Sequence, residues 1–333
     1  MRETDRRYRC FRERRRCRRL SGCFAGAKVN KPSNRSKGTK ARSTSGARGH
    51  RRPKSSARPG PSRSGPQRNK SRGETRSGTT TSKRDGLGGD HVEGRQAVRE
   101  LLRAGTRRTQ QVLISEDVYD TAVLAEIADL CEERRVPLRQ LSKRKLDDYA
   151  LTESHQGVIA QAEPIRSVAL ETLIAENPKK LPMVVALDGV TDPRNLGAVL
   201  RTAEVAGVTG VVLPRHRAAR LTPAAVKAAA GAVEHLPIAL VAGLPAAMKQ
   251  MSDKGLWIIG LDESAQTSIY DMRVATEPLT VVLGAEGEGI SHLIKQRCDQ
   301  LVAIPQTGQI GSLNVSNAAA ITIYEIKRQR EIS

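Results

Sequence analysis

From residue 181 onward, short apolar runs alternate with stretches of helical periodicity. Six of these runs are rich in Val, Ile and Leu and have the length of strands: MVVALDGV, VTGVVLP, IALV, WIIGLD, LTVVLG and LVAIP. Near-continuous apolar runs separated by helices are typical of a parallel sheet that is covered on both faces. We therefore predict an α/β domain over residues 181–333 in which ligands bind at the carboxyl ends of the strands.

Residues 88–163 show a weaker alternation of the same kind, about 75 residues long, which is an ordinary size for a small α/β domain. The spacing predicts helices over 91–102, over 118–134 and around Leu146, and strands over 111–114, 136–141 and 158–163. A helical or irregular connector over residues 164–180 would join the two domains.

Residues 1–87 lack both periodicities and carry the excess charge of the chain. They contain 28 of its 56 Lys and Arg residues but only 5 of its 35 Asp and Glu residues, among many Ser, Gly and Pro. Such a segment buries too little apolar surface to offset the entropy of ordering, so we predict a disordered basic tail. Its charge favours binding to phosphate backbones. A solubilising role, contact with anionic lipid and a translation-start artefact are the alternatives.

Cysteine usage and hydropathy bear on the compartment. The five cysteines form no C-x-x-C pair, which argues against a zinc site and a disulfide framework and favours a reducing cytoplasm. The sequence contains no run of about 18 apolar residues, so it predicts no membrane span. The first residues lack the apolar core of a secretory signal, although their Arg-rich, acid-poor composition is also compatible with an organellar transit peptide. We expect a cytoplasmic protein without a metal site.

Two loops that follow predicted strands carry candidate chemistry. After MVVALDGV, the segment TDPRNLGAVLR places Asn195 at the start of a helix and Arg201 six residues further along it. An ordinary helix cap and a solvated arginine are the simpler explanations of these two residues. After LTVVLG, residues 284–291 read GAEGEGIS, whose glycines leave backbone amides open to a ligand. The acidic residues would repel a pyrophosphate but tolerate a cation such as a sulfonium.

The loop after LVAIP, residues 304–316, reads IPQTGQIGSLNVS and runs directly into an Ala- and Ile-rich helix. Ser312 and Asn314 are candidate helix caps. Leu313 and Val315 alternate with them, which indicates an apolar lining for a ligand ring beside polar groups that hold it.

Together, NLGAVLR, LGAEGEGIS and IPxxGxxxSLNVS resemble the three signature motifs of the SpoU (TrmH-like) family of RNA ribose methyltransferases, in their usual order. The resemblance covers about residues 88–327. It implies a trefoil-knotted catalytic domain of the SPOUT superfamily. HVEGRQAVRELL and HQGVIAQ resemble the family's N-terminal substrate-binding domain, which is similar to ribosomal protein L30e. This pattern is most similar to the branch that acts on a guanosine of large-subunit ribosomal RNA.

The resemblance also implies the site. By motif position, the residues that contact S-adenosylmethionine would be Leu283, Gly284, Gly289, Ile304, Gly308 and Leu313. The catalytic and RNA-facing residues would be Asn195, Arg201, Glu286, Ser312 and Asn314. Gln306 departs from the family, in which an apolar residue is common, and so alters the wall of the pocket. A homodimer is implied too, because family pockets are completed across a two-fold interface.

We therefore predict S-adenosylmethionine-dependent 2′-O-methylation of a ribose in ribosomal RNA. The family's usual mechanism makes the motif-one arginine, here Arg201, a general base, but a guanidinium normally stays protonated. Binding of the target phosphate and stabilisation of the developing alkoxide is the alternative role. A tRNA methyltransferase of the same fold and a non-catalytic ribosome-assembly factor are the alternative functions. A nicotinamide-dependent enzyme is disfavoured because the glycines of residues 284–289 follow GxxGxG rather than GxGxxG.

Overall fold

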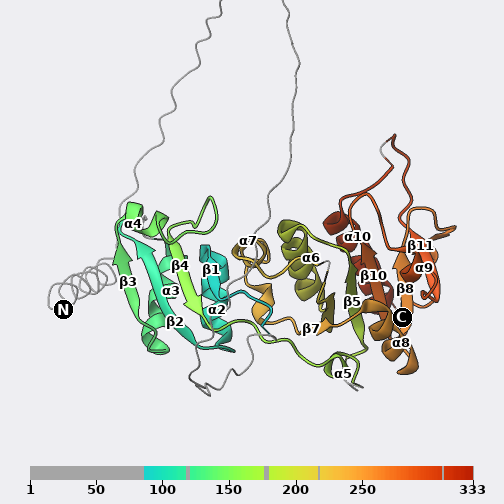
Figure 1. Ribbon diagram of the computed structural model, residues 1–333, viewed down its shortest axis with the longest axis horizontal. Coiled ribbons are helices and arrows are strands. Elements are labelled where there is room, and N and C mark those ends of the chain that lie inside the picture. The colour runs from blue at the N-terminus through green and yellow to red at the C-terminus, as the bar shows by residue number, and fades with distance from the viewer. Residues whose placement is uncertain (1–85, 118–120, 176–179, 217, 310, 333) are drawn as a thin grey trace, which may run out of the picture. The chain divides into compact units, whose positions relative to one another are not determined.

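The computed structural model describes residues 86–117, 121–175, 180–216, 218–309 and 311–332, whose helices and strands are shown in Figure 1. Apart from positions 86 and 87, the predicted disordered tail lies outside the described residues. Leu87 is buried, and its N–H donates a hydrogen bond to the carbonyl oxygen of Ile165 (2.9 Å). Leu87 thus belongs to the folded part of the chain.

In the described residues the first sheet has four strands in the order β1-β4-β2-β3. These strands are β1 (His91–Glu93), β2 (Thr109–Ser115), β3 (Leu138–Leu141) and β4 (Val158–Ala162). β4 pairs antiparallel with β1 and β2, whereas β2 and β3 are parallel. The accompanying helices are α2 (Arg95–Ala104), α3 (Ala122–Glu133) and α4 (Lys143–Asp147). The result is the small α/β unit that the hydrophobic pattern predicts.

The helix predicted over residues 91–102 is wrong in its first turn. His91–Glu93 form strand β1, and α2 begins only at Arg95. Gly94 separates the two elements with a φ of 98°, a conformation that a helix does not contain and that L side chains rarely adopt. Val92 is buried like the apolar residues of α2, so burial alone does not distinguish the strand from the helix.

The second sheet is parallel throughout its described strands, which are ordered β7-β6-β5-β10-β8-β11-β9. They are β5 (Met183–Asp188), β6 (Gly210–Pro214), β7 (Ile238–Val241), β8 (Trp257–Leu261), β9 (Thr267–Ser268), β10 (Leu279–Gly284) and β11 (Gln300–Ala303). Each of the six predicted apolar runs contains one strand, which confirms the predicted parallel sheet. The two-residue β9 lacks an apolar run and was not predicted.

Helices cover both faces of this sheet. They are α5 (Leu170–Leu173), α6 (Pro193–Ala206), α7 (Pro223–Ala228), α8 (Leu244–Asp253), α9 (His292–Lys295) and α10 (Val315–Ile332), with 3-10 turns η1 (Ala232–Glu234) and η2 (Ile269–Asp271). In β5, Val185 and Leu187 pack with α6 and α10, while Val184 and Ala186 pack with α8 on the other face. Each described helix is too short or too polar to cross a lipid bilayer.

Helix α10 connects the two edges of this sheet. It begins at Val315, next to the carboxyl ends of the strands, and Arg330 near its other end reaches the amino ends. The Arg330 guanidinium donates hydrogen bonds to four backbone carbonyl oxygens, those of Leu181, Pro182, Ala275 and Glu277. Because Leu181 and Pro182 precede β5 directly, the end of α10 is fixed to the start of the sheet.

A buried ion pair joins Arg107, just before β2 of the first sheet, to Glu234 in η1. Nε and Nη2 of Arg107 donate to the two carboxylate oxygens of Glu234 (3.0 and 2.6 Å), and both side chains are under 10% exposed. Nη1 of the same guanidinium donates to the carbonyl oxygens of Gly89 (2.6 Å) and Glu163 (2.5 Å). The charge of Arg107 is therefore both paired and hydrogen-bonded, as a buried charge requires.

Candidate active site

The turn after β10 is built on glycines. A Cβ on Gly284 would lie 1.9 Å from the carbonyl carbon of Gly289 and 2.2 Å from its oxygen. The backbones of Ala285 and Gly289 exchange two hydrogen bonds, of 3.1 and 2.9 Å, and Gly287 and Gly289 have φ values of 80° and 68°. The turn folds back onto its own strand this closely because Gly284 has no side chain.

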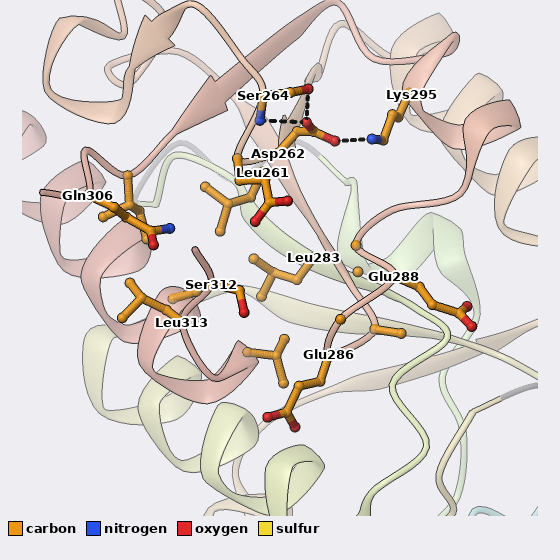
Figure 2. A pocket seen from close by; sticks show the side chains of 18 residues that line it. Leu261, Asp262, Ser264, Leu283, Glu286, Glu288, Lys295, Gln306, Ser312 and Leu313 are labelled. Atoms are coloured by element: carbon orange, nitrogen blue, oxygen red, sulfur yellow. Dashed lines mark hydrogen bonds and ion pairs between the residues drawn. The ribbon is translucent and has the colours of Figure 1, made fainter. Parts of the chain in front are cut away.

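A cavity lies between this turn, the carboxyl end of β8 and the segment after β11 (Figure 2). Its apolar wall consists of Leu261, Leu283, Ile304, Leu313 and Val315. Leu313 remains 38% exposed, which is unusual for a leucine beside an apolar wall. An apolar wall next to open backbone groups is suited to a flat ring with polar edges.

Acidic side chains form the polar part of the lining. The lining contains four carboxylates, those of Asp262, Glu263, Glu286 and Glu288, and one cation, Lys295. The carboxylate of Asp262 accepts hydrogen bonds from the N–H (2.9 Å) and the hydroxyl (2.5 Å) of Ser264 and forms an ion pair with Lys295 (Figure 2). Burial by itself raises the pKa of Asp262, but the bonds from Lys295 and Ser264 outweigh it, so this pKa is lowered. Asp262 is therefore ionised at neutral pH.

A chain of hydrogen bonds links the cavity to the first turn of α6. Nδ2 of Asn195 donates to the Glu286 carboxylate (3.1 Å), and Nδ2 of Asn314 donates to Oδ1 of Asn195 (3.0 Å). Oδ1 of Asn314 in turn accepts from the N–H and the hydroxyl of Ser316. Asp192 caps α6 by accepting from two of its first N–H groups and so fixes the position of Asn195. Three separate loops thus meet at Asn195.

The thiol of Cys298, on the segment between α9 and β11, is unsuited to covalent chemistry. Cys298 donates to the carbonyl oxygen of Ile294, and its sulfur would meet a Cβ on Gly260 at 2.7 Å. Burial, together with the charges of Asp299, Asp188 and Asp262, raises the pKa of this thiol to about 12. Since the thiolate is the nucleophilic form, Cys298 is inert at neutral pH.

Most of the predicted site residues come together. Those that line the cavity are Leu283, Gly284, Glu286, Gly289, Ile304, Ser312 and Leu313. Asn195 and Asn314 are held to Glu286 by the hydrogen-bond chain. Two predicted residues are not part of this cluster. Gly308 is absent from the cavity lining, and Arg201 is exposed elsewhere on α6, with no side-chain partner in the described part of the chain.

Helix geometry explains the position of Arg201. Six residues along an α-helix correspond to a rise of about 9 Å and a rotation of about 240°. Asn195 lies in the first turn of α6, at the carboxyl edge of the sheet, so Arg201 lies further down the helix on another side. Asn195 is therefore linked to the cavity through its hydrogen bond to Glu286, whereas Arg201 of the same chain lies away from that cavity.

Sequence reasoning missed the residues that follow β8. Asp262, Glu263 and Ser264 line the cavity, as does Lys295, whereas Gln306 lies in the lining as the sequence predicts. The run WIIGLD is a predicted strand, and the rule that ligands gather after the carboxyl ends of parallel strands applies to it as well. Its loop has no distinctive motif, so the position of Asp262 directly after the strand was the one available signal.

Comparison with known proteins agrees with this geometry. Residues 182–324 match the sequence profile of the SpoU rRNA Methylase family. Residues 91–168 match the profile of a second family, described as RNA 2'-O ribose methyltransferase substrate binding. The chain is 39% identical over 251 residues, 74% of its length and 100% of the relative's, to 23S rRNA (guanosine-2'-O-)-methyltransferase RlmB of Photobacterium profundum. The chain belongs to the SpoU rRNA methylase family.

Other members of the SpoU rRNA methylase family support the same assignment. RlmB of Pseudomonas putida is 38% identical over 73% of this chain and 98% of its own length. The SpoU methyltransferase AviRb from Streptomyces viridochromogenes, solved with the cofactor AdoMet, shares the fold with a TM-score of 0.62 at 23% identity, over 73% of this chain and 91% of its own. The chain is accordingly an RNA 2′-O-methyltransferase that uses S-adenosylmethionine.

Proposed function

We propose that this chain methylates the ribose 2′-hydroxyl of a guanosine in 23S rRNA. The observation that carries the proposal is the joining of the three motif loops at one cavity, through the hydrogen bonds from Asn195 to Glu286 and from Asn314 to Asn195. Sequence identities of 39% and 38% to two RlmB proteins, over 100% and 98% of their lengths, support the choice of RNA and nucleotide.

The cavity fits S-adenosylmethionine in shape and charge. The backbone of the glycine turn lines one side of the cavity, and the leucines form a wall for the adenine ring. The carboxylates exceed the lining cations, which suits a ligand with a positive sulfonium. Bound there, the donor supplies a methyl group that is already electrophilic. The protein then has to align the ribose oxygen and handle its proton.

Arg201 would act across a two-fold interface. Its guanidinium lies outside the cavity of its own chain, beside Val205, which is 60% exposed on the same helix. Helix α10 packs on α6 and exposes Ile321 (37%) and Tyr324 (44%). We propose that this apolar surface pairs with its copy in a homodimer, which would bring Arg201 of one chain to the cavity of the other.

In that position Arg201 binds the phosphate next to the target ribose and stabilises the developing alkoxide. A guanidinium stays protonated in proteins, so it is poorly suited to accept the ribose proton. It donates several hydrogen bonds in a fixed fork that fits a phosphate or an oxyanion. A carboxylate is a better proton acceptor, and Glu286, which is held by Asn195, lies at the cavity.

The finer description of the fold is also a proposal. We propose a trefoil knot in the catalytic domain of residues 181–333, supported by helix α10, which follows β11 in the chain but packs against α6 and β10, two strand positions or more away in the sheet. We also propose an L30e-like RNA-binding domain over residues 88–163, a linker over 164–180 and RNA contact by the basic tail. The four-stranded mixed sheet supports the L30e-like assignment of residues 88–163.

Ribose-methylation profiling of RNA tests the substrate. Deletion of the gene should remove one methylated guanosine from 23S rRNA, and the intact chain should restore it. Arg201→Ala should lower kcat by about 100- to 1,000-fold. Arg201→Lys should recover little of this loss if the fork geometry matters. Loss of a tRNA methylation instead, or of none, would contradict the proposal.

Mixing two inactive variants tests the dimer. A Gly284→Ala chain has a damaged cavity and an intact Arg201, and an Arg201→Ala chain has the reverse. If Arg201 acts across the interface, a mixed dimer contains one complete site, and activity returns on mixing. If Arg201 acts within its own chain, no mixed dimer is complete and the mixture stays inactive. Each variant alone is the control.

A further inference from the structure

The loop between β6 and α7 concentrates positive charge. Residues 215–220 read RHRAAR, and no acidic residue occurs along the chain between Glu204 and Glu234. The chain after residue 87 holds slightly more acidic than basic residues overall, so this stretch departs from its surroundings. Arg217 lies outside the described residues. His216 and Arg220 are exposed and have no hydrogen bond or ion pair in the described part of the chain.

Backbone hydrogen bonds hold the chain at Arg215 and at Ala219, on either side of position 217. The N–H of Arg215 donates to the carbonyl oxygen of Val241 (2.8 Å), and the N–H of Ala219 donates to that of Val190 (2.8 Å). Ala219 and Leu221 are buried on either side of the exposed Arg220. Because Ala219 and Leu221 hold the backbone on both sides of Arg220, binding of a ligand by Arg220 would cost mainly side-chain entropy.

The loop lies on the same sheet edge as the cavity. Strand order places β6 next to β5, and β5 next to β10, so the basic loop and the glycine turn follow strands that are about 10 Å apart. Val190, to which Ala219 is bonded, immediately precedes the turn that begins α6. Arg194 in the first turn of α6 is a further exposed cation, with no side-chain partner in the described residues.

In the described residues, the carboxylates of Asp192 and Asp188 form no ion pair with Arg194, His216 or Arg220. Asp192 accepts from the N–H groups of Arg194 and Asn195, and Asp188 accepts from the N–H of Ser291. Both carboxylates are thus directed at backbone groups rather than at the exposed basic side chains. Unpaired cations on an ordered backbone are a characteristic way in which proteins bind phosphate groups of nucleic acids.

We propose that Arg194, His216 and Arg220 bind the phosphate backbone of the RNA and place the target strand beside the cavity. The proposal rests on the proposed function, since it names the surface by which the same substrate is held. The ligand class is a polyanionic RNA backbone, recognised by charge rather than by base sequence. Arg220 is then a binding residue for RNA and has no contact with the methyl donor.

The salt dependence of RNA affinity in the full-length chain tests the proposal. The probe is a 23S rRNA fragment that the unaltered chain methylates. Each phosphate contact contributes about 0.7–0.9 to the slope of log affinity against log salt. Arg220→Ala should reduce that slope by about this amount, and Arg194→Ala/Arg220→Ala by about twice as much. Arg220→Lys should keep the slope, and donor affinity should stay within about twofold.

Lys254→Ala is the matched control. Lys254 is an exposed cation at the C-terminal end of α8, which leads into the amino end of β8, on the opposite edge of the sheet. Its removal should leave the slope unchanged. The proposal is overturned if Arg220→Ala binds RNA with the affinity and slope of the unaltered chain, or if Lys254→Ala lowers the slope equally. If the unaltered chain methylates no RNA, the proposed function itself has failed.

Discussion

The glycine turn after β10 and the basic loop after β6 occupy the same edge of one sheet but differ in charge and in construction. The turn and its neighbours line a cavity with four carboxylates and one lysine. The turn keeps its tight shape because Gly284 has no side chain. The loop presents exposed cations, and hydrogen bonds to Val241 and Val190 hold its backbone at Arg215 and Ala219. The difference teaches that one sheet edge can serve two ligands of opposite charge, a cationic donor and an anionic RNA, by dividing them between adjacent strands.

The strongest way to separate the two regions is Gly284→Ala. The added Cβ would lie 1.9 Å from the Gly289 backbone, so the turn must move and the cavity must change shape. Donor affinity measured by calorimetry should fall by more than about 100-fold, about 3 kcal/mol in binding free energy. RNA affinity should change little, because the basic loop is untouched.

Gly308→Ala is the control for that experiment. Gly308 has no atom within 4 Å of a built Cβ and does not line the cavity, although the family motif places it at the donor. Donor affinity should stay within about twofold of the unaltered chain, since the new methyl group meets nothing. A loss comparable to that of Gly284→Ala would show that Gly308 contacts the donor after all.

A smaller effect is expected from Asn195→Ala, which breaks the link between the loops. The change leaves Glu286 and Asn314 without their common partner, and an unmade hydrogen bond of this kind costs about 1–3 kcal/mol. We expect kcat to fall by about 10- to 100-fold in a single-turnover methylation assay, with RNA affinity unchanged. Asn195→Asp keeps the shape but cannot donate to Glu286. Full activity of Asn195→Asp would contradict a role for that hydrogen bond.

The last comparison concerns the acidic side of the cavity and the dependence of protein stability on pH. Because the pKa of Asp262 is lowered in the folded chain, its ionised form stabilises the fold above the ordinary Asp pKa of about 3.9. This contribution disappears as pH falls through the lowered pKa. Asp262→Asn should lower the free energy of unfolding by about 1–3 kcal/mol at pH 7. The difference should shrink below about pH 4.

Asp253→Asn provides the comparison for that titration. Asp253 pairs with Lys249, but both side chains are more than 60% exposed, so the change should have almost no effect on unfolding. Unfolding curves in denaturant at several pH values measure both variants. A difference for Asp262→Asn that grew toward acid pH would mean that its carboxyl is not stabilised in the ionised form.

The fold could be predicted where burial alone decides it. The apolar runs at β5, β6 and β10 are buried on both faces, so their strands are evident without knowledge of their neighbours. The start of α2 could not be placed, because Gly94 ends a strand by a backbone torsion that leaves no trace in hydrophobicity. The two-residue β9 is likewise too short to have a period.

The candidate site could be predicted where residues lie in motifs, and less well where three-dimensional placement matters. Gly284, Glu286 and Leu313 lie in motif loops and line the cavity. Asp262 belongs to no motif and enters the site through the strand order, which places β8 beside β10 and β11. Arg201 lies in a motif yet away from the cavity, because a helix turns it from Asn195. The motifs thus predict which residues belong to the site better than they predict where the side chains lie in three dimensions.

The anchoring of α10 ties the donor cavity to the opposite edge of the sheet. Val315 and Ala318, which line the cavity, lie on this helix, and Arg330 holds its far end to the residues that precede β5. Fifteen residues of helix separate Val315 from Arg330, a length of about 22 Å. A change at Arg330 would therefore reach the wall of the cavity along the helix, although the side chain itself lies far from the methyl donor.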